Sequence, residues 1–413
     1  MPGLDLGAGP WAFASTPKVE AGERCVLVSE TYARVRSLAR QVPISRVVDL
    51  TPLDDLGLPV YSAVTPLARD LKTHNGKGPT REAARVSALM EAVERVAAEG
   101  THAPTVIATY EELERNGPLP PVDPRGFDLP ADTAFRPDAR FAWVPGRELL
   151  AGRDVLIPLD LVITPPAEGI LRDVDTNGVA SGNVHLEAVA HAICEVVERD
   201  ALSQVLFAAT FGEPAEQPRA ERIDLGTLPP RALEWAERIA RAGLELDVHD
   251  ITSDVGVPTF DALVLDPHYP APGGGWRPRR FFGLGTHPDP DVAVFRALSE
   301  AIQARLIVIQ SARDSYNRIR TTSGGDPPPA ARQIERGGQR SFAGVNGLRS
   351  PDLKADLDFL LARLARAGVR QCVAADLTHP AWSIPVVRVR IAGLSPYCVN
   401  LRRAGPRCWR HLL

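Results

Sequence analysis

One segment occurs three times in the chain, and this repeat limits the folds that the chain can adopt. The copies span residues 84–95, 188–199 and 293–304 and read ARVSALMEAVER, AVAHAICEVVER and AVFRALSEAIQA. They align without a gap, and their starting points are 104 and then 105 residues apart. Self-similarity at a regular interval indicates structurally equivalent elements. This interval is that of a pseudo-repeat and is too long for a solenoid.

Each copy has the composition of an α-helix. Alanine, leucine, methionine, glutamate and arginine are strong helix formers, and no proline or glycine interrupts the segments. On a helix the polar side chains of each copy fall on one face, while alanine, valine, isoleucine and leucine cover the others. The polar positions are Ser87, Glu91, Glu94 and Arg95, then Glu187, His191, Glu195, Glu198 and Arg199, and finally Arg296, Glu300 and Gln303. The sequence therefore predicts three helices that are packed on most sides and carry glutamate on the remaining face.

Two interpretations of these glutamate faces are open. A charged stripe is the ordinary solvent-facing side of an amphipathic helix. Here, however, all three stripes repeat glutamate and are poor in lysine. Carboxylates that are brought together repel unless a cation lies between them, and oxygen ligands suit Mg²⁺. Since Mg²⁺ is usually shared with phosphate oxygens, and arginine binds phosphate, the pattern predicts a magnesium–nucleotide site between the three helices.

The segments that lead into the first two helices fit an anion site. Gly76-Lys77-Gly78 is expected to be a flexible basic loop before Thr80, which can cap the first helix. Lys77 is either a phosphate contact or a solvated loop lysine. The tract TNGVASGNV places Ser181 and Asn183 directly before the second helix, and a glycine-containing loop at a helix N-terminus can bind an anion. The same tract is also a common way to enter a helix.

Composition narrows the class of protein. The chain has 413 residues, of which 44% are hydrophobic and 24% charged, as in soluble globular proteins. Its net charge of −4 and the lack of a dense basic stripe argue against nucleic-acid binding. No apolar run could span a membrane, so a cytoplasmic location is expected. The five cysteines contain no CxxC pair, which disfavours a disulfide framework or a zinc site.

The rest of the chain alternates helix and strand signals, which predicts an α/β (α+β) fold with mixed sheets. Residues 1–24 and the proline-rich residues 115–138 are expected to be irregular, and residues 323–339 to be mobile. Strands are predicted within residues 46–64, 141–144, 154–163, 244–251, 259–265 and 386–391, and amphipathic helices over 231–243 and 351–369. No helix or strand is predicted for the basic end of the chain. This gives an N-terminal lead (1–45), a main domain (46–395) and a C-terminal tail (396–413).

The three motifs, taken in order, resemble those of the YcaO family. Its pattern Sx₃ExxER is similar to Ser87, Glu91, Glu94 and Arg95, and its second pattern, an Asn and a Glu before ExxER, to Asn183 through Arg199. Its third pattern is similar to Arg296, Glu300 and Gln303, and the likeness runs from about residue 47 to residue 394. The resemblance implies a YcaO-like fold in which helices from the pseudo-repeats converge on ATP and Mg²⁺. It makes Glu91, Glu94, Glu187, Glu195, Glu198 and Glu300 the metal ligands, and Lys77, Ser87, Ser181, Asn183, Arg199, Arg296 and Gln303 the ATP-binding residues.

The resemblance also implies an activity. In this family ATP phosphorylates a backbone amide oxygen of a ribosomally synthesised precursor peptide, and a nucleophile then displaces phosphate. A Cys, Ser or Thr side chain gives an azoline, an amine gives an amidine, and sulfide gives a thioamide. No general base can be named from the sequence.

Two departures from the family patterns bear on the nucleophile. The chain ends GPRCWRHLL instead of in the Pro-x-Pro-x-Pro tail of many azoline-forming members. The run Ser311-Ala312-Arg313-Asp314-Ser315 matches only the middle of the Gly-Ala-Arg-Asp/Glu-Asp run of members associated with the TfuA protein. We therefore expect a nucleophile carried by the peptide, with TfuA-partnered thioamide formation as the alternative and a non-catalytic ATP-binding scaffold as the second alternative. A separate leader-binding or TfuA-like partner is expected, because no fused precursor-binding domain fits before the core, and a homodimer is possible.

Overall fold

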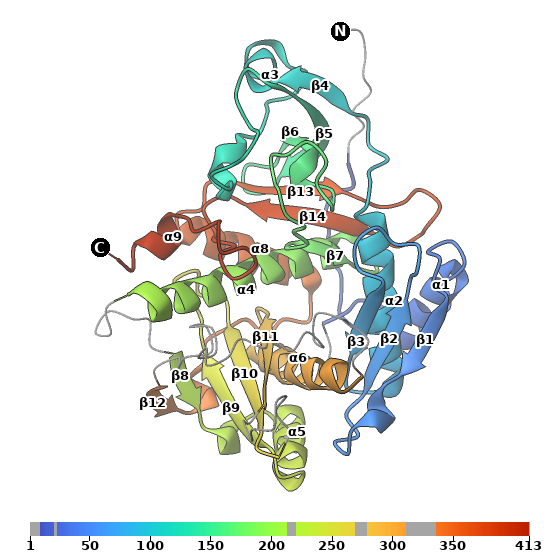
Figure 1. Ribbon diagram of the computed structural model, residues 1–413, viewed down its shortest axis with the longest axis vertical. Helices are drawn as coiled ribbons and strands as arrows, with labels where there is room; N and C mark the ends of the chain where they lie inside the picture. Colours follow the sequence, from blue (N-terminus) through green and yellow to red (C-terminus); the bar gives the residue numbers. More distant parts are fainter. Residues whose placement is uncertain (1–8, 20–22, 213–219, 269–278, 311–335, 413) are drawn as a thin grey trace, which may run out of the picture.

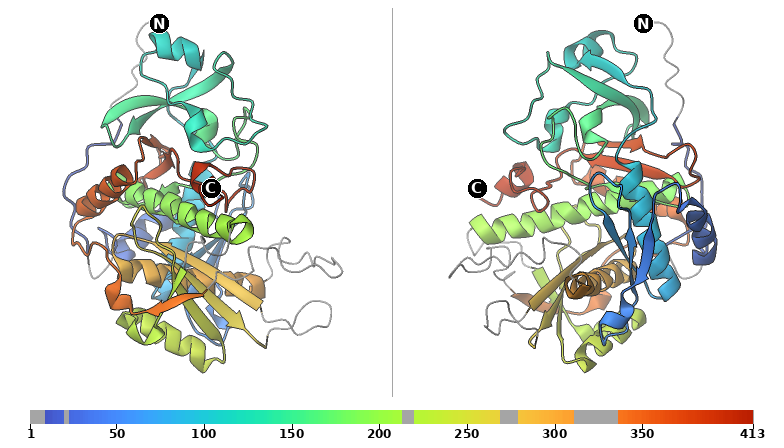
Figure 2. Two further views of the ribbon diagram at one scale, coloured as in Figure 1. Left: turned by 90° about the vertical axis from the view of Figure 1, so that its left-hand side faces the viewer. Right: turned by 45° about the vertical axis from the view of Figure 1, so that its right-hand side comes forward.

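The computed structural model describes residues 9–19, 23–212, 220–268, 279–310 and 336–412 (Figure 1). Within these residues three β-sheets are combined with helices, so the predicted mixed α+β class is confirmed. Figures 1 and 2 show the long helix α4 (His185–Phe211) lying between the upper sheet and the lower sheet of the molecule. None of the described helices combines the length and apolar character needed to cross a membrane.

The first sheet is antiparallel and has the order β1-β2-β3 (Arg46–Asp49, Val60–Val64, Thr73–Lys77). The predicted strand pair in residues 46–64 is confirmed by β1 and β2. The predicted basic loop is wrong, because Gly76 and Lys77 are the last residues of β3 and pair with Tyr61 and Val60. This strand is polar, yet its middle residues are buried: His74 is fully buried, and its Nε2 lies 2.6 Å from Thr65 Oγ1.

Two helices pack next to this sheet. Helix α2 (Arg81–Ala97) contains the first repeat and begins at Thr80, whose hydroxyl accepts a hydrogen bond from Ala83 N at 3.1 Å, as predicted. Helix α1 (Val28–Leu38) packs against α2 and was not predicted. Only Thr31, Val35 and Leu38 of this helix are buried. Because so few of its positions need an apolar residue, its sequence shows only a weak apolar periodicity.

The second sheet has the order β11-β10-β9-β8-β12 (Arg279–Thr286, Thr259–Asp266, Glu245–Asp250, Ala220–Ile223, Arg336–Arg340). Helices α5 (Pro230–Arg241) and α6 (Pro290–Gln310) cover it, and α6 packs along β11 and β10. The predicted strands over 244–251 and 259–265 and the helix over 231–243 are confirmed. Strand β12 lies at the end of the segment predicted as mobile; residues 323–335 of that segment lie outside the described residues.

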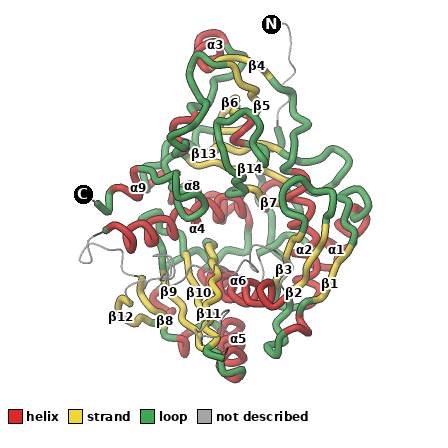
Figure 3. Tube along the Cα trace, in the orientation of Figure 1, coloured by secondary structure: helices red, strands yellow, loops and turns green. Residues whose placement is uncertain are grey.

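The third sheet contains the path β4-β5-β13-β14-β7 (Val106–Thr109, Arg140–Glu148, Cys372–Asp376, Val386–Ile391, Val179–Ser181), and β6 (Arg153–Pro158) pairs with β5. The predicted strand over 154–163 is too long, because the backbone turns into a short 3-10 helix at Leu159–Leu161 directly after Pro158. Helix α3 (Tyr110–Asn116) follows β4, and much of the surrounding chain is loop (Figure 3). Helix α8 (Leu353–Arg366) confirms the predicted helix over 351–369 and packs against α4.

The pseudo-repeat consists of a strand followed by a helix: β3–α2, β7–α4 and β11–α6. In the first unit a Cβ on Gly76 would lie 2.0 Å from Ala88 N, and in the third a Cβ on Gly285 would lie 2.0 Å from Ala293 O and 2.5 Å from Ala297 N. The strand backbone therefore lies directly against the helix at the alanine that the repeats share. In these two units the close approach sets the distance between the helix and its strand.

Candidate functional site

The three repeat helices are tied to one another through their polar faces. Strand β7 bonds to α2 through Ser181 N, which donates to Glu94 Oε2 at 3.0 Å. Strand β3 bonds to α6 through Lys77 Nζ, which lies 2.6 Å from Glu300 Oε2. Helix α4 bonds to α6 where His191 Nε2 lies 2.7 Å from Arg296 Nη2. Residues that are more than 80 places apart in the sequence thus meet at one location.

The glutamates of this location interact unfavourably with one another. Burial raises the pKa of Glu94 to about 8, and the charges of Glu195 and Glu91 add to the increase. Burial together with the charge of Glu300 raises the pKa of Glu198 to about 7. Burial also raises the pKa of Glu195, although Arg199 and Arg95 oppose the change. Such repulsion between buried carboxylates is relieved when a cation binds between them.

Glu300 differs because it already has a cationic partner. Burial alone would raise its pKa, but Lys77 and Arg199 lower the pKa below its ordinary value. Lys77 is the last residue of β3, and its ammonium group bonds to the carboxylate of Glu300. The structure therefore places Lys77 among the predicted site residues, as part of a Lys–Glu pair.

Glu187, in the first turn of α4, is surrounded by donors. Arg24 Nη1 lies 2.9 Å from its Oε1, Cys25 N donates to its Oε2 at 3.3 Å, and Asn183 Nδ2 donates to Oε1 at 3.2 Å. Asn183 is itself held by Thr31, whose hydroxyl donates to Asn183 Oδ1 at 2.9 Å. Three residues of the N-terminal lead therefore complete the environment of Glu187 and Asn183.

Arg296 of α6 also has a partner from the N-terminal lead. Its Nη1 lies 3.2 Å from Glu23 Oε2. Burial alone would raise the pKa of Glu23. The nearby charges of Arg24 and Arg296 outweigh this effect and hold that pKa below its ordinary range. Burial and the charge of Arg296 lower the pKa of His191, so this imidazole is neutral at ordinary pH.

A small recess of about 20 Å³ adjoins these charges. It lies where the N-terminal lead, α4, α6 and α8 meet. Its polar lining residues are Glu23, Arg24, Glu187, His191, His287, Arg296 and Asp356. The recess is thus lined by Glu187, a predicted metal ligand, and Arg296, a predicted ATP contact, together with residues that the sequence analysis did not select.

The remaining predicted residues lie as follows. Glu91 is four residues before Arg95, and their side chains are 3.9 Å apart. Ser87 lies partly buried one turn earlier on α2. Arg199 Nη2 lies 3.7 Å from Glu198 Oε1. Gln303 is buried and its Nε2 donates to Asn75 O at 2.6 Å, so in this structure it links α6 to β3.

Glu23, Arg24, Cys25, Thr31 and His287 are the neighbours that sequence reasoning missed. The first four lie outside the repeats, in a stretch without a motif, and they reach the site only through the fold. His191 occupies the same repeat position as Ser87 and Arg296, and this alignment could have selected it. The run from Ser311 to Ser315 lies outside the described residues.

The predicted metal-binding residues have the ligand type of Mg²⁺ but are not gathered into a complete site. In the part of the chain that the structure describes, no three Asp, Glu, His or Cys side chains form a ready-made metal site. The predicted metal ligands are nevertheless all carboxylates, which is the ligand type of Mg²⁺. Burial, with neighbouring glutamates adding to it, raises the pKa values of Glu94 and Glu198 despite the nearby arginines. The residues therefore fit a cation that shares its ligands with a nucleotide.

The chain matches a protein family and several known proteins. The family described as YcaO cyclodehydratase, ATP- and Mg²⁺-binding, matches residues 75–395. A protein of Rhizobium leguminosarum bv. trifolii, described as lying in the tfuA 3′ region, is 32% identical over 95% of this chain and 93% of its own length. A protein of Methanothermobacter thermautotrophicus is 32% identical over 93% of this chain and 98% of its own length.

Solved structures share the fold. YcaO from Methanopyrus kandleri, bound with AMPPCP and Mg²⁺, has a TM-score of 0.70 and 26% identity, and the match covers 94% of this chain and 98% of that one. A heterocyclase in complex with substrate and cofactor has a TM-score of 0.75 and 23% identity, with 93% of this chain and 54% of that longer chain covered. The predicted fold and the predicted cofactors, ATP and Mg²⁺, are thereby confirmed. The order of the motifs, the fold and the family match lead to the same conclusion: the chain belongs to the YcaO family.

Proposed function

We propose that this chain uses ATP and Mg²⁺ to phosphorylate a backbone amide oxygen of a ribosomally synthesised precursor peptide. One observation carries the proposal. Glutamates from α2, α4 and α6 lie close enough to repel one another: the charges of Glu195 and Glu91 add to the effect of burial in raising the pKa of Glu94 to about 8, and the charge of Glu300 adds to it in raising that of Glu198 to about 7. Basic residues lie beside them. A carboxylate cluster next to arginines and a lysine is suited to Mg²⁺ and the phosphates of ATP.

The predicted glutamates and four of the predicted ATP-binding residues have a role in this proposal. The glutamates at positions 91, 94, 187, 195, 198 and 300 would hold Mg²⁺, directly or through water, and the bound ion supplies charge neutralisation at the phosphates. Arg199 and Arg296 would bind phosphate oxygens, because a guanidinium can bond two oxygens at once. Lys77 and Asn183, at the entries to α2 and α4, would hold the same phosphates in position.

The chemistry explains why ATP is required. An amide oxygen is a poor leaving group, and transfer of the γ-phosphoryl group to it turns it into phosphate. The carbonyl carbon is then attacked by a nucleophile, and the bond from carbon to the phosphorylated oxygen breaks. Because phosphoryl transfer depends mainly on positioning and charge neutralisation, the residues of this site are sufficient to assist the transfer step.

The product depends on the nucleophile. We favour a nucleophile of the peptide itself, which gives an azoline or amidine with loss of water, in line with the family description as cyclodehydratase. Thioamide formation with sulfide is the second candidate. The name of the Rhizobium relative, which places it in a tfuA 3′ region, favours this candidate and a TfuA-like partner. A separate leader-binding protein and the precursor peptide are the other proposed partners.

Isotope transfer tests the amide activation. A precursor peptide encoded beside the gene is labelled with ¹⁸O at its backbone amides and incubated with the protein, ATP, Mg²⁺ and the neighbouring partner protein. We expect one labelled oxygen in phosphate for each modification, for either product. Phosphate without label would contradict amide phosphorylation, and absence of ATP turnover with every precursor offered would support the scaffold alternative.

Mass spectrometry of the same peptide separates the two products. Loss of one water indicates an azoline or amidine, whereas exchange of one oxygen for one sulfur indicates a thioamide. Exchange that is seen only with sulfide and a TfuA-like protein would overturn the first choice and leave the assignment of the ATP site unchanged.

A further inference from the structure

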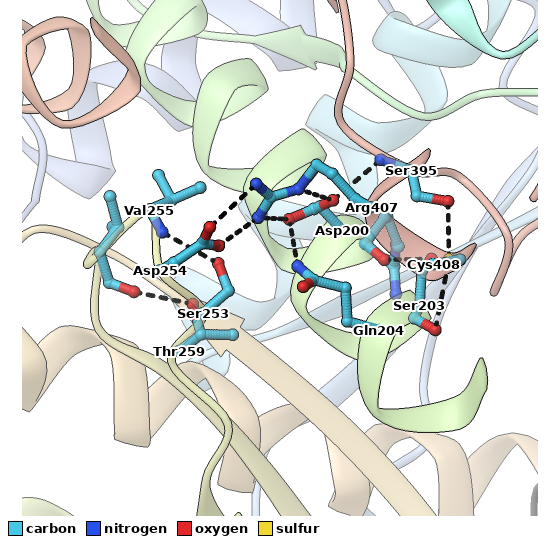
Figure 4. Close-up of polar contacts among 12 residues, drawn as sticks. Asp200, Ser203, Gln204, Ser253, Asp254, Val255, Thr259, Ser395, Arg407 and Cys408 are labelled. Carbon is cyan, nitrogen blue, oxygen red and sulfur yellow. Dashed lines mark hydrogen bonds and ion pairs between the residues drawn. The ribbon is translucent and has the colours of Figure 1, made fainter. Parts of the chain in front are cut away.

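Asp200 follows the predicted phosphate-binding Arg199 on α4 and is completely buried. Four hydrogen bonds saturate its carboxylate (Figure 4). Oδ1 accepts from Ser395 N and from Arg407 Nε, both at 2.9 Å. Oδ2 accepts from Arg407 Nη2 at 2.9 Å and from Gln204 Nε2 at 2.8 Å. Arg407, in the short helix α9 (Pro406–Trp409), therefore binds both oxygens of Asp200, which is the strong bidentate geometry.

The same C-terminal segment also contacts the backbone of Arg199. Cys398 Sγ donates to Arg199 O at 3.2 Å, and Ser203 Oγ donates to the same oxygen at 2.6 Å. Cys398 N in turn donates to Ser203 Oγ at 2.9 Å. The segment thus holds the turn of α4 that begins at Arg199 at three places: the carbonyl of Arg199, the hydroxyl of Ser203 and the carboxylate of Asp200.

The guanidinium of Arg407 has a second partner on its outer side. Arg407 Nη1 lies 3.2 Å from Asp254 Oδ2, and Arg410 Nη1 lies 2.9 Å from the same oxygen. Asp254 belongs to the loop between β9 and β10, and its side chain is 45% exposed. The outer contact with Asp254 ties the tail to a loop, whereas the inner contact with Asp200 ties it to α4. Arg407 Nη2 bonds to both carboxylates, to Asp200 Oδ2 and to Asp254 Oδ1, so a substitution at Asp254 removes the outer partner and leaves the inner one in place.

We propose that Arg407 is a positioning residue for the ATP site, acting through Asp200 on Arg199; this inference rests on the proposed function. A buried carboxylate that loses its guanidinium is left uncompensated, so the turn of α4 around it must adjust. Arg199 lies in that turn, and a displaced guanidinium binds phosphate less well. Partners that orient a ligand-binding group commonly change affinity by 10- to 100-fold when they are altered.

The test compares two variants by calorimetry with ATP and Mg²⁺. Arg407→Lys keeps a positive charge beside Asp200, but an ammonium group cannot bind both oxygens in the planar geometry of arginine. We expect its Kd for ATP to rise about tenfold. Asp254→Asn is the matched control, because it removes the charge of the outer partner and keeps all four hydrogen-bond donors of Asp200, and its Kd should equal that of the wild type. Circular dichroism confirms that each variant is folded at the temperature of the measurement.

A double-mutant cycle with Arg199→Lys shows whether Arg407 acts through Arg199. If it does, Arg407→Lys has little further effect on the Kd once Arg199 is replaced, whereas independent effects add. If Arg407→Lys folds poorly, the variant with both Asp200→Asn and Arg407→Met removes the two buried charges together and is expected to weaken ATP binding in the same way.

The outcomes separate this inference from the proposed function. A wild-type protein that does not bind ATP with Mg²⁺ would overturn both. A wild type that binds, together with an unchanged Kd in the Arg407 variants or with additive effects in the cycle, would overturn the role of Arg407 alone.

Discussion

At the scale of single residues, Glu195 shows why charge governs this site. It lies at the same repeat position as Glu91 and Glu300, and its charge contributes to the raised pKa values of Glu94 and Glu198. A glutamine has the same shape without the charge. It should therefore relieve repulsion in the protein without cation and remove an anionic ligand when Mg²⁺ and ATP are bound.

We predict that Glu195→Gln stays folded and loses activity by at least about 100-fold, as when a key charge-stabilising group is removed from an active site. ATP turnover with the precursor peptide measures the loss, and thermal unfolding checks the fold. Glu82→Gln is the control, since Glu82 is exposed in the first turn of α2. If Glu195→Gln retained near-normal turnover, the convergent-carboxylate site would be wrong.

His287 makes the stability of the fold depend on pH. It is buried beside the recess, and burial lowers its pKa from 6.5 to about 3, with Arg296 adding to the effect and Glu23 opposing it. In the unfolded chain the imidazole of His287 is protonated as the pH falls through about 6.5, whereas in the folded chain it is protonated only near pH 3. The stabilisation that neutral His287 provides is therefore complete above pH 6.5 and is lost as the pH falls from 6.5 towards 3.

We predict that the free energy of unfolding falls in this range by up to about 1.4 kcal/mol per pH unit for one such proton. Urea unfolding at a series of pH values from 7 to 5 measures the slope. His287→Asn should lower the slope by up to about 1.4 kcal/mol per pH unit, because asparagine does not titrate. Asparagine can still accept the hydrogen bond that His287 Nδ1 receives from Asp289 N. An unchanged slope in His287→Asn would contradict this role.

At the scale of elements, the strand–helix unit repeated as β3–α2 and β11–α6 depends on glycine at the point of contact. A Cβ on Gly76 would lie 2.0 Å from Ala88 N and 2.2 Å from Ala84 O, which are backbone atoms that cannot swing away. We predict that Gly76→Ala lowers the free energy of unfolding by about 1–3 kcal/mol, the usual cost of overpacking. Chemical denaturation measures the change.

Gly100→Ala is the matched control for this prediction. No atom lies within 4 Å of a Cβ at Gly100, so the substitution should leave the free energy of unfolding unchanged or raise it slightly. Equal stability of Gly76→Ala and Gly100→Ala would show that α2 does not lie against β3 as described.

The elements differ in how well the sequence predicts them. The repeat helices were predictable because strong helix formers carry a regular polar face. Strand β3 was not, since its residues His74, Asn75 and Lys77 are polar, and the burial of His74 and Asn75 depends on partners elsewhere in the fold. Helix α1 was missed because few of its residues are buried, and the end of β6 because Pro158 interrupts an otherwise strand-like run.

At the scale of the whole molecule, the site combines segments from both ends of the chain. Arg24 and Glu23 reach Glu187 and Arg296 from the N-terminal lead, and Arg407 reaches Asp200 from the C-terminal segment. Sequence motifs could select the glutamates and arginines of the repeat helices, because their spacing is local. They could not select Glu23, Arg24 or Arg407, whose roles arise only from contacts between residues far apart in the chain.

The central claim is that α2, α4 and α6 together form one site for ATP and Mg²⁺. Its direct measurement is calorimetric titration of the full chain with ATP, at fixed Mg²⁺ and again with EDTA, followed by titration of Mg²⁺ into the ATP-bound protein. We predict that ATP binds with Mg²⁺, that EDTA abolishes tight binding, and that more than one Mg²⁺ binds per nucleotide, because six glutamates together with phosphate oxygens exceed the six positions of one octahedral ion. Tight ATP binding that EDTA leaves unchanged would contradict the claim.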